Sequence, residues 1–366
     1  MFLVTRTTVV RLVVGTGAAA MLYGALLLLM VHRQFRHEQE TARRIVAAGG
    51  WCSFTYRGPR CIPYWLNQQY PCFVRLTQIT MTRNAHALSG CGSLPFLERL
   101  TLKGADVTSG DLVSLHEFPN LTVLHLGKTR VTDACLVQLR GLTNLQELHL
   151  NETDVRGEGF ENLKSLQRLV KLTVAGTPVD DSGLSQLPFL RRLEDLNLRR
   201  TKITSNALER LTRFPSLKRL DLDETAICDE GLDQLQQFKQ LATLSMMRTR
   251  ITDSGLISLS DVTSLEKLYL DSTQITGNGL AYLGALPHLD RLDLRNTPIT
   301  DDSLALLGTF PSLTRMDLSE SAITDQGLQY LVGLKLTSVL LQETETTAEG
   351  RTILRRVRGC RTLPDP

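Results

Sequence analysis

The sequence predicts an α/β fold: a solenoid of stacked coils, preceded by one apolar helix that crosses a membrane. Two observations support this prediction. The pattern LxxLxL recurs every 24 residues through most of the chain, and each copy is followed by a turn and by apolar residues at helical spacing. An uncharged run of 20 residues, 12–31, stands near the N-terminus. Coils that repeat without insertion bury their apolar sides against each other, which gives an elongated molecule.

Length, charge and composition narrow the class of protein. The chain has 366 residues and a formal net charge of +3, so it lacks the concentrated positive charge of a nucleic-acid-binding protein. Aromatic residues make up only 5% of the chain, so leucine and other aliphatic side chains must supply the core. We therefore expect no nucleic acid among its partners.

The first fifty residues divide into three segments. Residues 1–11 form a short basic tail. Residues 12–31, LVVGTGAAAMLYGALLLLMV, would as a helix span roughly 30 Å, the thickness of the bilayer's hydrocarbon core. A cleavable signal peptide would have a shorter apolar core and a small-x-small cleavage site, and no such site follows. We therefore predict an uncleaved, single-pass transmembrane helix, a signal anchor, and then a basic juxtamembrane helix over 32–50.

Two arguments about membrane orientation disagree. More arginines follow the apolar run than precede it, and the positive-inside rule then places the repeats in the cytoplasm. A short basic N-terminus before an apolar run is also typical of a signal anchor, which exports the following domain. The cysteines described below favour export, and export is the orientation that we expect. The arginines concerned are Arg6 and Arg11 before the run, and Arg33, Arg36, Arg43 and Arg44 after it.

Residues 51–96 are predicted to cap the N-terminal end of the solenoid, and they include a degenerate first repeat. Both tryptophans, Trp51 and Trp65, lie in this segment. Four of the seven cysteines also lie there, and in an oxidising compartment they are candidates for disulfides. The alternative is that they are small buried apolar residues. Their irregular spacing contains no CxxC pair, so we expect no zinc site. The four are Cys52, Cys61, Cys72 and Cys91.

Ten 24-residue repeats occupy residues 97–335. Each LxxLxL is predicted to be a short strand with its leucines facing inward, and the strands pair in parallel on the concave face. In the clearest copy, Thr252 is suited to cap a short helix on the convex face, and Asp253 suits its first turn. The repeats begin at Leu97, Leu121, Leu145, Leu169, Leu193, Leu217, Leu241, Leu265, Leu289 and Leu313.

The end of the chain, 336–366, reads as a final partial repeat followed by a C-terminal cap helix around Ile353, Leu354 and Val357. A single coil cannot fold alone, because ordering its residues costs on the order of 1.5 kcal/mol each. Only stacking and end caps stabilise the array. After each strand stands a threonine, from Thr129 to Thr297, whose hydroxyl we expect to serve the turn backbone of neighbouring coils.

The pattern LxxLxLxxTxITDxGLxxL resembles the cysteine-containing class of leucine-rich repeats, with threonine in place of the cysteine. That class is known from F-box substrate adaptors of ubiquitin ligases and from related bacterial proteins. The whole layout is similar to the membrane-anchored leucine-rich-repeat proteins of planctomycete bacteria. The resemblance implies a leucine-rich-repeat solenoid of horseshoe shape that acts as an interaction module. F-box helices are absent from the sequence, since the apolar run occupies their expected place.

Enzyme motifs are missing from the sequence. It contains no GxSxG, no HExxH and no phosphate-binding loop, and the uninterrupted repeats leave no irregular loops to gather catalytic groups. We therefore predict a protein that is not an enzyme and that uses no cofactor and no metal. His125 and His149 fall on neighbouring strands and can share a metal, but without a carboxylate beside them solvated histidines are the favoured interpretation.

A partner-binding site is predicted on the strand face. Residues 24 apart form columns, because parallel strands stack about 4.8 Å apart. Two columns alternate in charge: Arg199 falls opposite Asp223, Asp271 opposite Arg295, and Glu224 lies between Arg200 and Arg248. Self-neutralising surface pairs are one interpretation. The other is a protein-binding site, since tyrosine, arginine and methionine are enriched at interfaces. Its candidate residues are Arg199, Arg200, Met247, Arg248, Tyr269, Asp271 and Arg295.

Three functions remain open from the sequence. The favoured one is a membrane-tethered scaffold that binds a protein of unknown identity, with no small-molecule substrate evident. The second is a substrate-recognition adaptor that faces the cytoplasm, similar to the F-box subunits. The third is an enzyme whose site lies in the cap and uses His86 or the cap cysteines.

Overall fold

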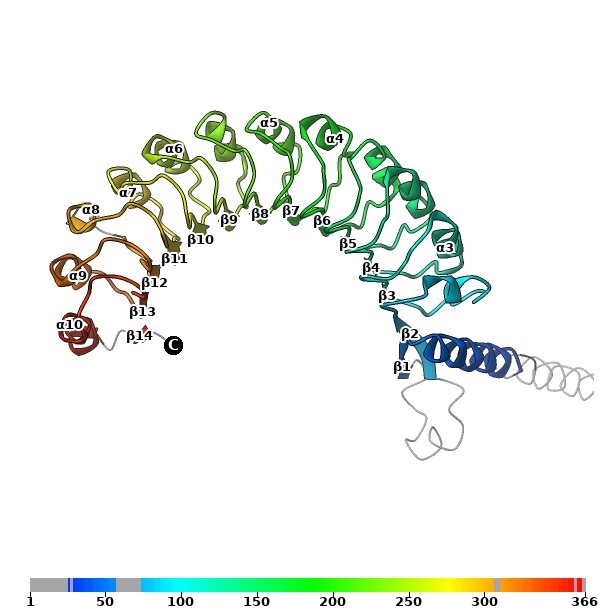
Figure 1. Ribbon diagram of the computed structural model, residues 1–366. Helices are drawn as coiled ribbons and strands as arrows, with labels where there is room; N and C mark the ends of the chain where they lie inside the picture. The colour runs from blue at the N-terminus through cyan, green and yellow to red at the C-terminus, as the bar shows by residue number, and fades with distance from the viewer. Residues whose placement is uncertain (1–25, 27–28, 57–73, 306–309, 359–360, 364–366) are drawn as a thin grey trace, which may run out of the picture.

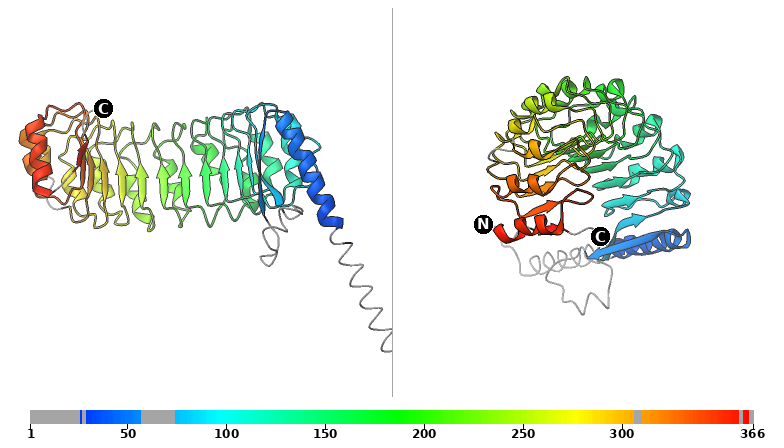
Figure 2. Two further views of the ribbon diagram at one scale, coloured as in Figure 1. Left: turned by 90° about the horizontal axis from the view of Figure 1, so that it is seen from below. Right: turned by 60° about the vertical axis from the view of Figure 1, so that its left-hand side comes forward.

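The chain forms a curved solenoid with its strands on the inner side of the arc and its helices on the outer side (Figure 1). The computed structural model describes residues 26, 29–56, 74–305, 310–358 and 361–363. One sheet runs the length of the solenoid, and its strands follow each other in chain order. Viewed from below, the strands lie side by side across the concave face (Figure 2). The predicted solenoid of parallel strands and short helices is confirmed.

The sheet has 14 strands in the described residues. All neighbours from β2 onward are parallel, whereas β1 pairs with β2 in antiparallel fashion. The strands are β1 (Trp51–Tyr56), β2 (Val74–Thr80), β3 (Arg99–Thr101), β4 (Val123–His125), β5 (Glu147–His149), β6 (Lys171–Thr173), β7 (Asp195–Asn197), β8 (Arg219–Asp221), β9 (Thr243–Ser245), β10 (Lys267–Tyr269), β11 (Arg291–Asp293), β12 (Arg315–Asp317), β13 (Ser338–Leu340) and β14 (Arg361–Leu363).

The convex side carries short helices, of which several are 3-10 rather than α. A 24-residue coil must hold a strand, two turns and a return, so little length is left for a helix, and 3-10 helices are common in short connections of this kind. The α-helices are α3 (Ser109–Val113), α4 (Asp181–Ser185), α5 (Ala207–Leu211), α6 (Asp253–Leu259), α7 (Leu280–Leu283), α8 (Asp301–Ala305), α9 (Asp325–Leu331) and α10 (Ala348–Arg358). The 3-10 helices are η2 (Ala85–Leu88), η3 (Ser114–Glu117), η4 (Asp133–Leu139), η5 (Phe160–Ser165) and η6 (Leu232–Gln237).

One continuous core lies between strands and helices. In β3, Leu100 faces this core and is fully buried, while its neighbours Arg99 and Thr101 face the concave side. The central residue of every strand from β4 to β13 is buried in the same way, as expected where alternate side chains face opposite sides of a sheet. Each fully buried leucine contributes roughly 1.5–3 kcal/mol, so the coils hold together by burying their leucines jointly.

The turn after each strand contains one residue in the left-handed region. Arg200, Glu224 and Arg248 have φ values of 55°, 53° and 55°, and the equivalent residues of the other coils behave alike. This conformation turns the backbone so that the N–H of Arg200 donates to the carbonyl of Asp223 in the next coil, at 2.8 Å. As a result, Arg200 and Arg248 lie at the rim of the concave face and are exposed.

The threonine that follows this turn has a local role, which corrects our expectation. The hydroxyl of Thr249 donates to the carbonyl of Met246, three residues earlier in the same coil, at 2.6 Å. Thr249 is buried, so its hydroxyl has no solvent to bond. The bond stays within one coil because the tight turn brings the hydroxyl under its own strand's end. Equivalent bonds are formed by Thr129, Thr153, Thr177, Thr201, Thr225, Thr273 and Thr297.

An N-terminal helix over 29–47 docks on the first strands of the solenoid (Figure 1). Its inner face is buried through Glu38, Thr41, Ala42 and Ile45. Most of the predicted membrane span, 12–31, lies outside the described residues. Within the described part of the chain, none of the helices combines the length and apolar composition needed to cross a membrane.

The two end caps differ in part from expectation. At the N-terminal end, Trp51 is 57% exposed on β1, so it does not fill the cap core, and Trp65 lies outside the described residues. At the C-terminal end, the predicted helix is present as α10, where Leu354 is buried. Strand β14, which adds a last parallel strand beside β13, was not predicted.

Candidate protein-binding surface

Three of the seven predicted site residues meet in one pocket of the concave face. Arg199, Met247 and Tyr269 line a pocket of about 340 Å³ that extends over the ends of β7, β8, β9 and β10. The other side chains that line it are Asp195, Asn197, Arg219, Leu220, Asp221, Asp223, Thr243 and Ser245. Residues 24 positions apart therefore lie next to each other, as the predicted columns require. Their side chains surround a pocket rather than a flat surface.

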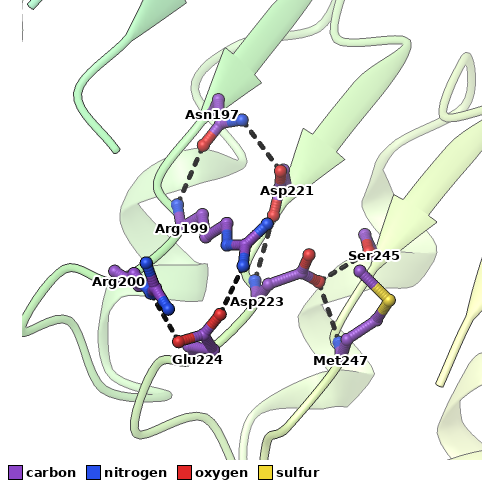
Figure 3. A network of polar contacts seen from close by, with 8 residues as sticks. All are labelled: Asn197, Arg199, Arg200, Asp221, Asp223, Glu224, Ser245 and Met247. Atoms are coloured by element: carbon purple, nitrogen blue, oxygen red, sulfur yellow. Dashed lines mark hydrogen bonds and ion pairs between the residues drawn. The ribbon is translucent and has the colours of Figure 1, made fainter. Parts of the chain in front are cut away.

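Two arginines of this region, Arg199 and Arg200, pair with Glu224 (Figure 3). The guanidinium groups of Arg199 and Arg200 each lie 2.5 Å from a carboxylate oxygen of Glu224. Arg199 therefore does not form the ion pair with Asp223 that the columns suggested. The left-handed turn places Glu224 between the two arginine side chains, and its longer side chain reaches both.

The remaining predicted residues lie farther along the same face or at its rim. Arg295 pairs with Glu320 rather than with Asp271. Arg248 is exposed, and among the described residues its side chain forms no ion pair or hydrogen bond. Tyr269 carries the guanidinium of Arg291 over its ring, 5.1 Å from the ring centroid. Arg248 is thus the arginine of this group that is best placed to meet a partner.

Asp221 and Asp223 are central to the pocket, although they were not among the predicted site residues. Asp221 accepts hydrogen bonds from the side-chain amide of Asn197 at 2.8 Å and from the N–H of Asp223 at 3.1 Å. Asp223 accepts from the hydroxyl of Ser245 at 2.5 Å and from the N–H of Met247 at 2.8 Å. Burial, and then the charge of Asp223, raise the pKa of Asp221 to about 6. Burial also raises the pKa of Asp223.

A second carboxylate pair follows on β11 and β12. Asp293 and Asp317 are neighbours in register, and both are buried. Each accepts a hydrogen bond from the backbone N–H two residues later. Burial, followed by the charge of Asp317, raises the pKa of Asp293 to about 6. Asn197 and Asp221 likewise accept a hydrogen bond from the backbone N–H two residues later. An Asn or Asp at the end of a strand is therefore the sequence feature from which this local bond could have been predicted.

The two histidines form a stacked pair on the concave face. The rings of His125 and His149 lie 4.8 Å apart between centroids, with 16° between their planes. Burial, and then the charge of His149, lower the pKa of His125 to about 4. Contrary to our expectation, a carboxylate stands beside them, with Glu147 at 3.4 Å from His149. Still, no group of three His, Cys, Asp or Glu residues in the described segments is arranged to hold a metal ion.

The cap cysteines are partly outside the described residues. Cys52 and Cys91 are free thiols in the described part of the chain, and Cys61 and Cys72 fall in the segment 57–73 that is not described. The possible disulfides among these four cysteines stay a prediction. Burial raises the pKa of Cys52 to about 11, which disfavours the reactive thiolate. His86 bonds Asp111 at 2.8 Å.

Comparison with known proteins identifies the repeat. A family model described as a leucine-rich repeat region matches residues 120–350. The internalin InlF from Listeria monocytogenes str. 4b F2365 is 20% identical, with a TM-score of 0.56, over 88% of this chain and 94% of that chain. Internalin C2 of the same strain is 25% identical over 58% and 84% of the two chains, with a TM-score of 0.44. No curated protein matches the sequence.

A plant receptor is a further similar structure. The peptide hormone receptor RGFR1, solved in complex with RGF2, is 17% identical over 72% of this chain and 46% of that chain, with a TM-score of 0.47. At these identities the similarity to InlF shows a shared fold.

Proposed function

The chain belongs to the leucine-rich repeat family, and on that premise we propose that it binds a protein partner in the concave face of its solenoid. The observation that carries the proposal is the composition of that face around the pocket. Met247 and Tyr269 line that pocket, and the exposed Arg248 follows Met247 directly in the chain. Methionine, tyrosine and arginine are among the side chains that are enriched at protein interfaces. We assign a binding function to this face and propose no catalytic activity for it.

The proposal includes a membrane tether. The uncharged run 12–31 has the length of a membrane span, and the helix over 29–47 leads from its end directly onto the first strands of the solenoid. A solenoid held in this way presents its concave face at a fixed place relative to the bilayer. We further propose that the solenoid is exported and meets its partner outside the cytoplasm.

Site-specific photo-cross-linking in cells that express the full chain tests the binding face. A photoreactive benzoylphenylalanine replaces Tyr269 in the concave pocket or, as the matched control, Tyr282, which is 45% exposed on the convex helix α7. We expect a discrete cross-linked protein from position 269 and none from position 282. Cross-links from position 282 alone, or from neither position, would contradict the proposal.

Cysteine labelling tests the orientation. In a variant that lacks all seven native cysteines, Gln236→Cys places one thiol on η6, where residue 236 is exposed. Labelling of intact cells by a membrane-impermeant maleimide supports export. Labelling only after lysis would contradict export, and it would support the cytoplasmic adaptor instead, the alternative that the basic residues Arg33, Arg36, Arg43 and Arg44 favour under the positive-inside rule.

A further inference from the structure

The N-terminal helix over 29–47 leaves the solenoid at the rim where the strands begin. Near its start, the carbonyl of Val31 accepts a hydrogen bond of 3.5 Å from Arg75, the second residue of β2. Beyond its end, Gly50 lies against the side chain of Met81, which directly follows β2. The helix and β2 therefore run in the same direction. Figure 2 shows the helix beside the strands, with its first turns extending past one edge of the solenoid.

The end of the apolar run 12–31 therefore lies at this rim. Val31 is the last residue of the run. Arg75, which bonds it, also lies over the ring of Phe96, with 4.9 Å between the guanidinium carbon and the ring centroid. Phe96 is exposed in the loop that leads into β3, and the corresponding loops of the other coils line up along the same edge (Figure 2). A bilayer that contains the run would thus have its surface beside this edge.

Basic residues are concentrated on this rim in the middle of the solenoid. The loops that lead into β6, β7 and β8 contain six lysines and arginines and one acidic residue. The turns after the same strands, on the opposite rim, contain three basic and five acidic residues. The loops are 164–170, 188–194 and 212–218, and the turns are 175–181, 199–205 and 223–229. We call the six cations of the loops the basic rim: Lys164, Arg168, Arg191, Arg192, Arg213 and Lys218.

The side chains of the basic rim are available to a partner. All six are exposed. Lys218 pairs with Glu194 at 3.0 Å, and Arg168 donates to the side chain of Asn144 at 2.7 Å. The ion pairs among the described residues do not include the other three arginines, Arg191, Arg192 and Arg213.

An aromatic side chain stands among these cations. Phe189 is 49% exposed in the loop that leads into β7, two residues before Arg191. Surfaces that lie on a bilayer combine basic residues with exposed apolar side chains, because the cations meet lipid phosphates while the apolar groups enter the headgroup boundary. Basic residues near an anionic leaflet are attracted to it. The rim beside Val31 therefore has the chemistry of a membrane-contacting surface.

We propose that the basic rim lies on the bilayer that holds the chain, where its cations contact anionic phospholipid headgroups and Phe189 enters the interface. The inference rests on the membrane tether of the proposed function. Because the tether keeps this rim beside lipid, headgroups have a higher effective concentration there than a dissolved anionic partner. The concave face lies between the two rims, so it then opens along the membrane surface rather than away from it.

Tryptophan quenching in the full chain, reconstituted in lipid nanodiscs, tests the contact. The discs contain phosphatidylcholine, phosphatidylglycerol and a lipid with a nitroxide on its headgroup, which quenches the fluorescence of a nearby tryptophan. Trp51→Phe and Trp65→Phe remove the native signal. Phe189→Trp then places one tryptophan on the basic rim, and Lys202→Trp, at an exposed position of the opposite rim, is the matched control. We expect strong quenching at position 189 and little at position 202.

Charge reversal tests the role of the cations. In the Phe189→Trp protein, Arg191→Glu combined with Arg192→Glu should lower quenching at position 189 to the level of position 202, because the anionic headgroups then repel the rim. Lys202→Glu combined with Arg250→Glu changes two exposed cations of the opposite rim and should leave the quenching unchanged. Circular dichroism checks that both variants are folded. Discs without phosphatidylglycerol should quench position 189 less.

Several outcomes would overturn the inference. Equal quenching at positions 189 and 202 would show no preferred edge, and quenching that survives both charge reversal and the removal of phosphatidylglycerol would show no recognition of headgroup charge. A chain that enters the discs without quenching at position 189 would leave the tether intact and assign the basic rim to another anionic partner, such as an acidic protein. A chain that enters no disc would refute the tether and this inference together, while photo-cross-linking from position 269 tests the binding face independently.

Discussion

The carboxylate of Asp229 holds Thr252 of the next coil by two hydrogen bonds. One oxygen accepts from the N–H of Thr252 at 2.9 Å and the other from its hydroxyl at 2.5 Å. The hydroxyl of Thr252 in turn accepts from the N–H of Ser254 and caps α6. One carboxylate thus fixes where the next helix begins. Asp133, Asp181, Asp253, Asp301 and Asp325 also bond the coil that follows them.

Replacing Asp229 by alanine should therefore destabilise the solenoid. The variant loses two hydrogen bonds to a charged acceptor, and we expect the free energy of unfolding to fall by about 1–3 kcal/mol. Urea denaturation followed by circular dichroism measures the change. Asp233→Ala, on the exposed side of the neighbouring η6, is the control and should stay within about 0.5 kcal/mol of the wild type. Equal midpoints for the two variants would show that the bonds between coils contribute little.

These contacts show what sequence reasoning supplied and what it missed. The 24-residue period was sufficient to predict the solenoid and the register of its strands, because leucines at fixed spacing leave one way of stacking. Thr252 was correctly expected to cap a helix. Asp253 was expected to stabilise the first turn of that helix by placing a negative charge near the positive end of the helix dipole. The hydrogen bond that the Thr276 hydroxyl donates to the Asp253 carboxylate was missed, because the two residues lie 23 positions apart and meet only when the coils stack.

Ion pairs on the concave face were predicted less well, for a local reason. The columns correctly placed Arg199 next to Asp223, but the turn residues adopt the left-handed conformation, and their side chains reach diagonally between columns. Arg199 therefore bonds Glu224. Side-chain conformation decides such pairings, and the period of a repeat does not encode it.

The buried hydroxyl of Thr249 provides a second test of the turn. Thr249→Val keeps the shape of the side chain and removes the donor to the carbonyl of Met246. Because an unsatisfied buried acceptor costs roughly 1–3 kcal/mol, we expect a loss of that size in urea denaturation. Thr249→Ser keeps the hydroxyl and should lose less. A valine variant as stable as the wild type would mean that solvent reaches the carbonyl.

Stability should depend on pH through Asp293. Burial and Asp317 raise its pKa to about 6, above the value of about 3.9 for an unfolded chain. The folded state therefore binds more protons between these values, and its stability falls as pH rises from about 4 to about 6. Asp293→Asn keeps the acceptor for the N–H of Arg295 and cannot ionise. We expect it to be more stable than the wild type at pH 7, by on the order of 2 kcal/mol, and to lose this advantage at pH 4.

The comparison requires urea denaturation of both proteins at several pH values. His125 has the opposite effect on the pH dependence of stability. Its pKa is lowered to about 4, so the folded state resists protonation of this residue. Both proteins keep His125, so its contribution cancels in the difference between them. A difference that is constant from pH 4 to pH 7 would show that Asp293 titrates normally.

Glu38 should control the docking of the N-terminal helix. It is only 1% exposed, accepts the N–H of Leu76 at 2.8 Å and lies 3.7 Å from Arg75. Glu38→Ala leaves that N–H without its acceptor and removes the carboxylate that pairs with the buried guanidinium of Arg75, which keeps a bond of 3.5 Å to the carbonyl of Val31. Breaking a buried pair costs roughly 3–5 kcal/mol. Because each coil contacts mainly its neighbours, the loss should stay local. Hydrogen exchange should accelerate over 38–47 and over β2, and remain unchanged from β5 onward.

Glu40→Ala is the matched control, since Glu40 is exposed on the outer side of the same helix. It should leave hydrogen exchange over 38–47 unchanged. Trypsin gives an independent readout, because Arg43 and Arg44 lie within the docked segment and are cut faster once the helix detaches from the solenoid. If Glu38→Ala accelerated exchange through all coils alike, the helix would be part of one cooperative unit with the solenoid. If it changed neither exchange nor cleavage, docking would depend on the apolar contacts of Ala42 and Ile45 instead.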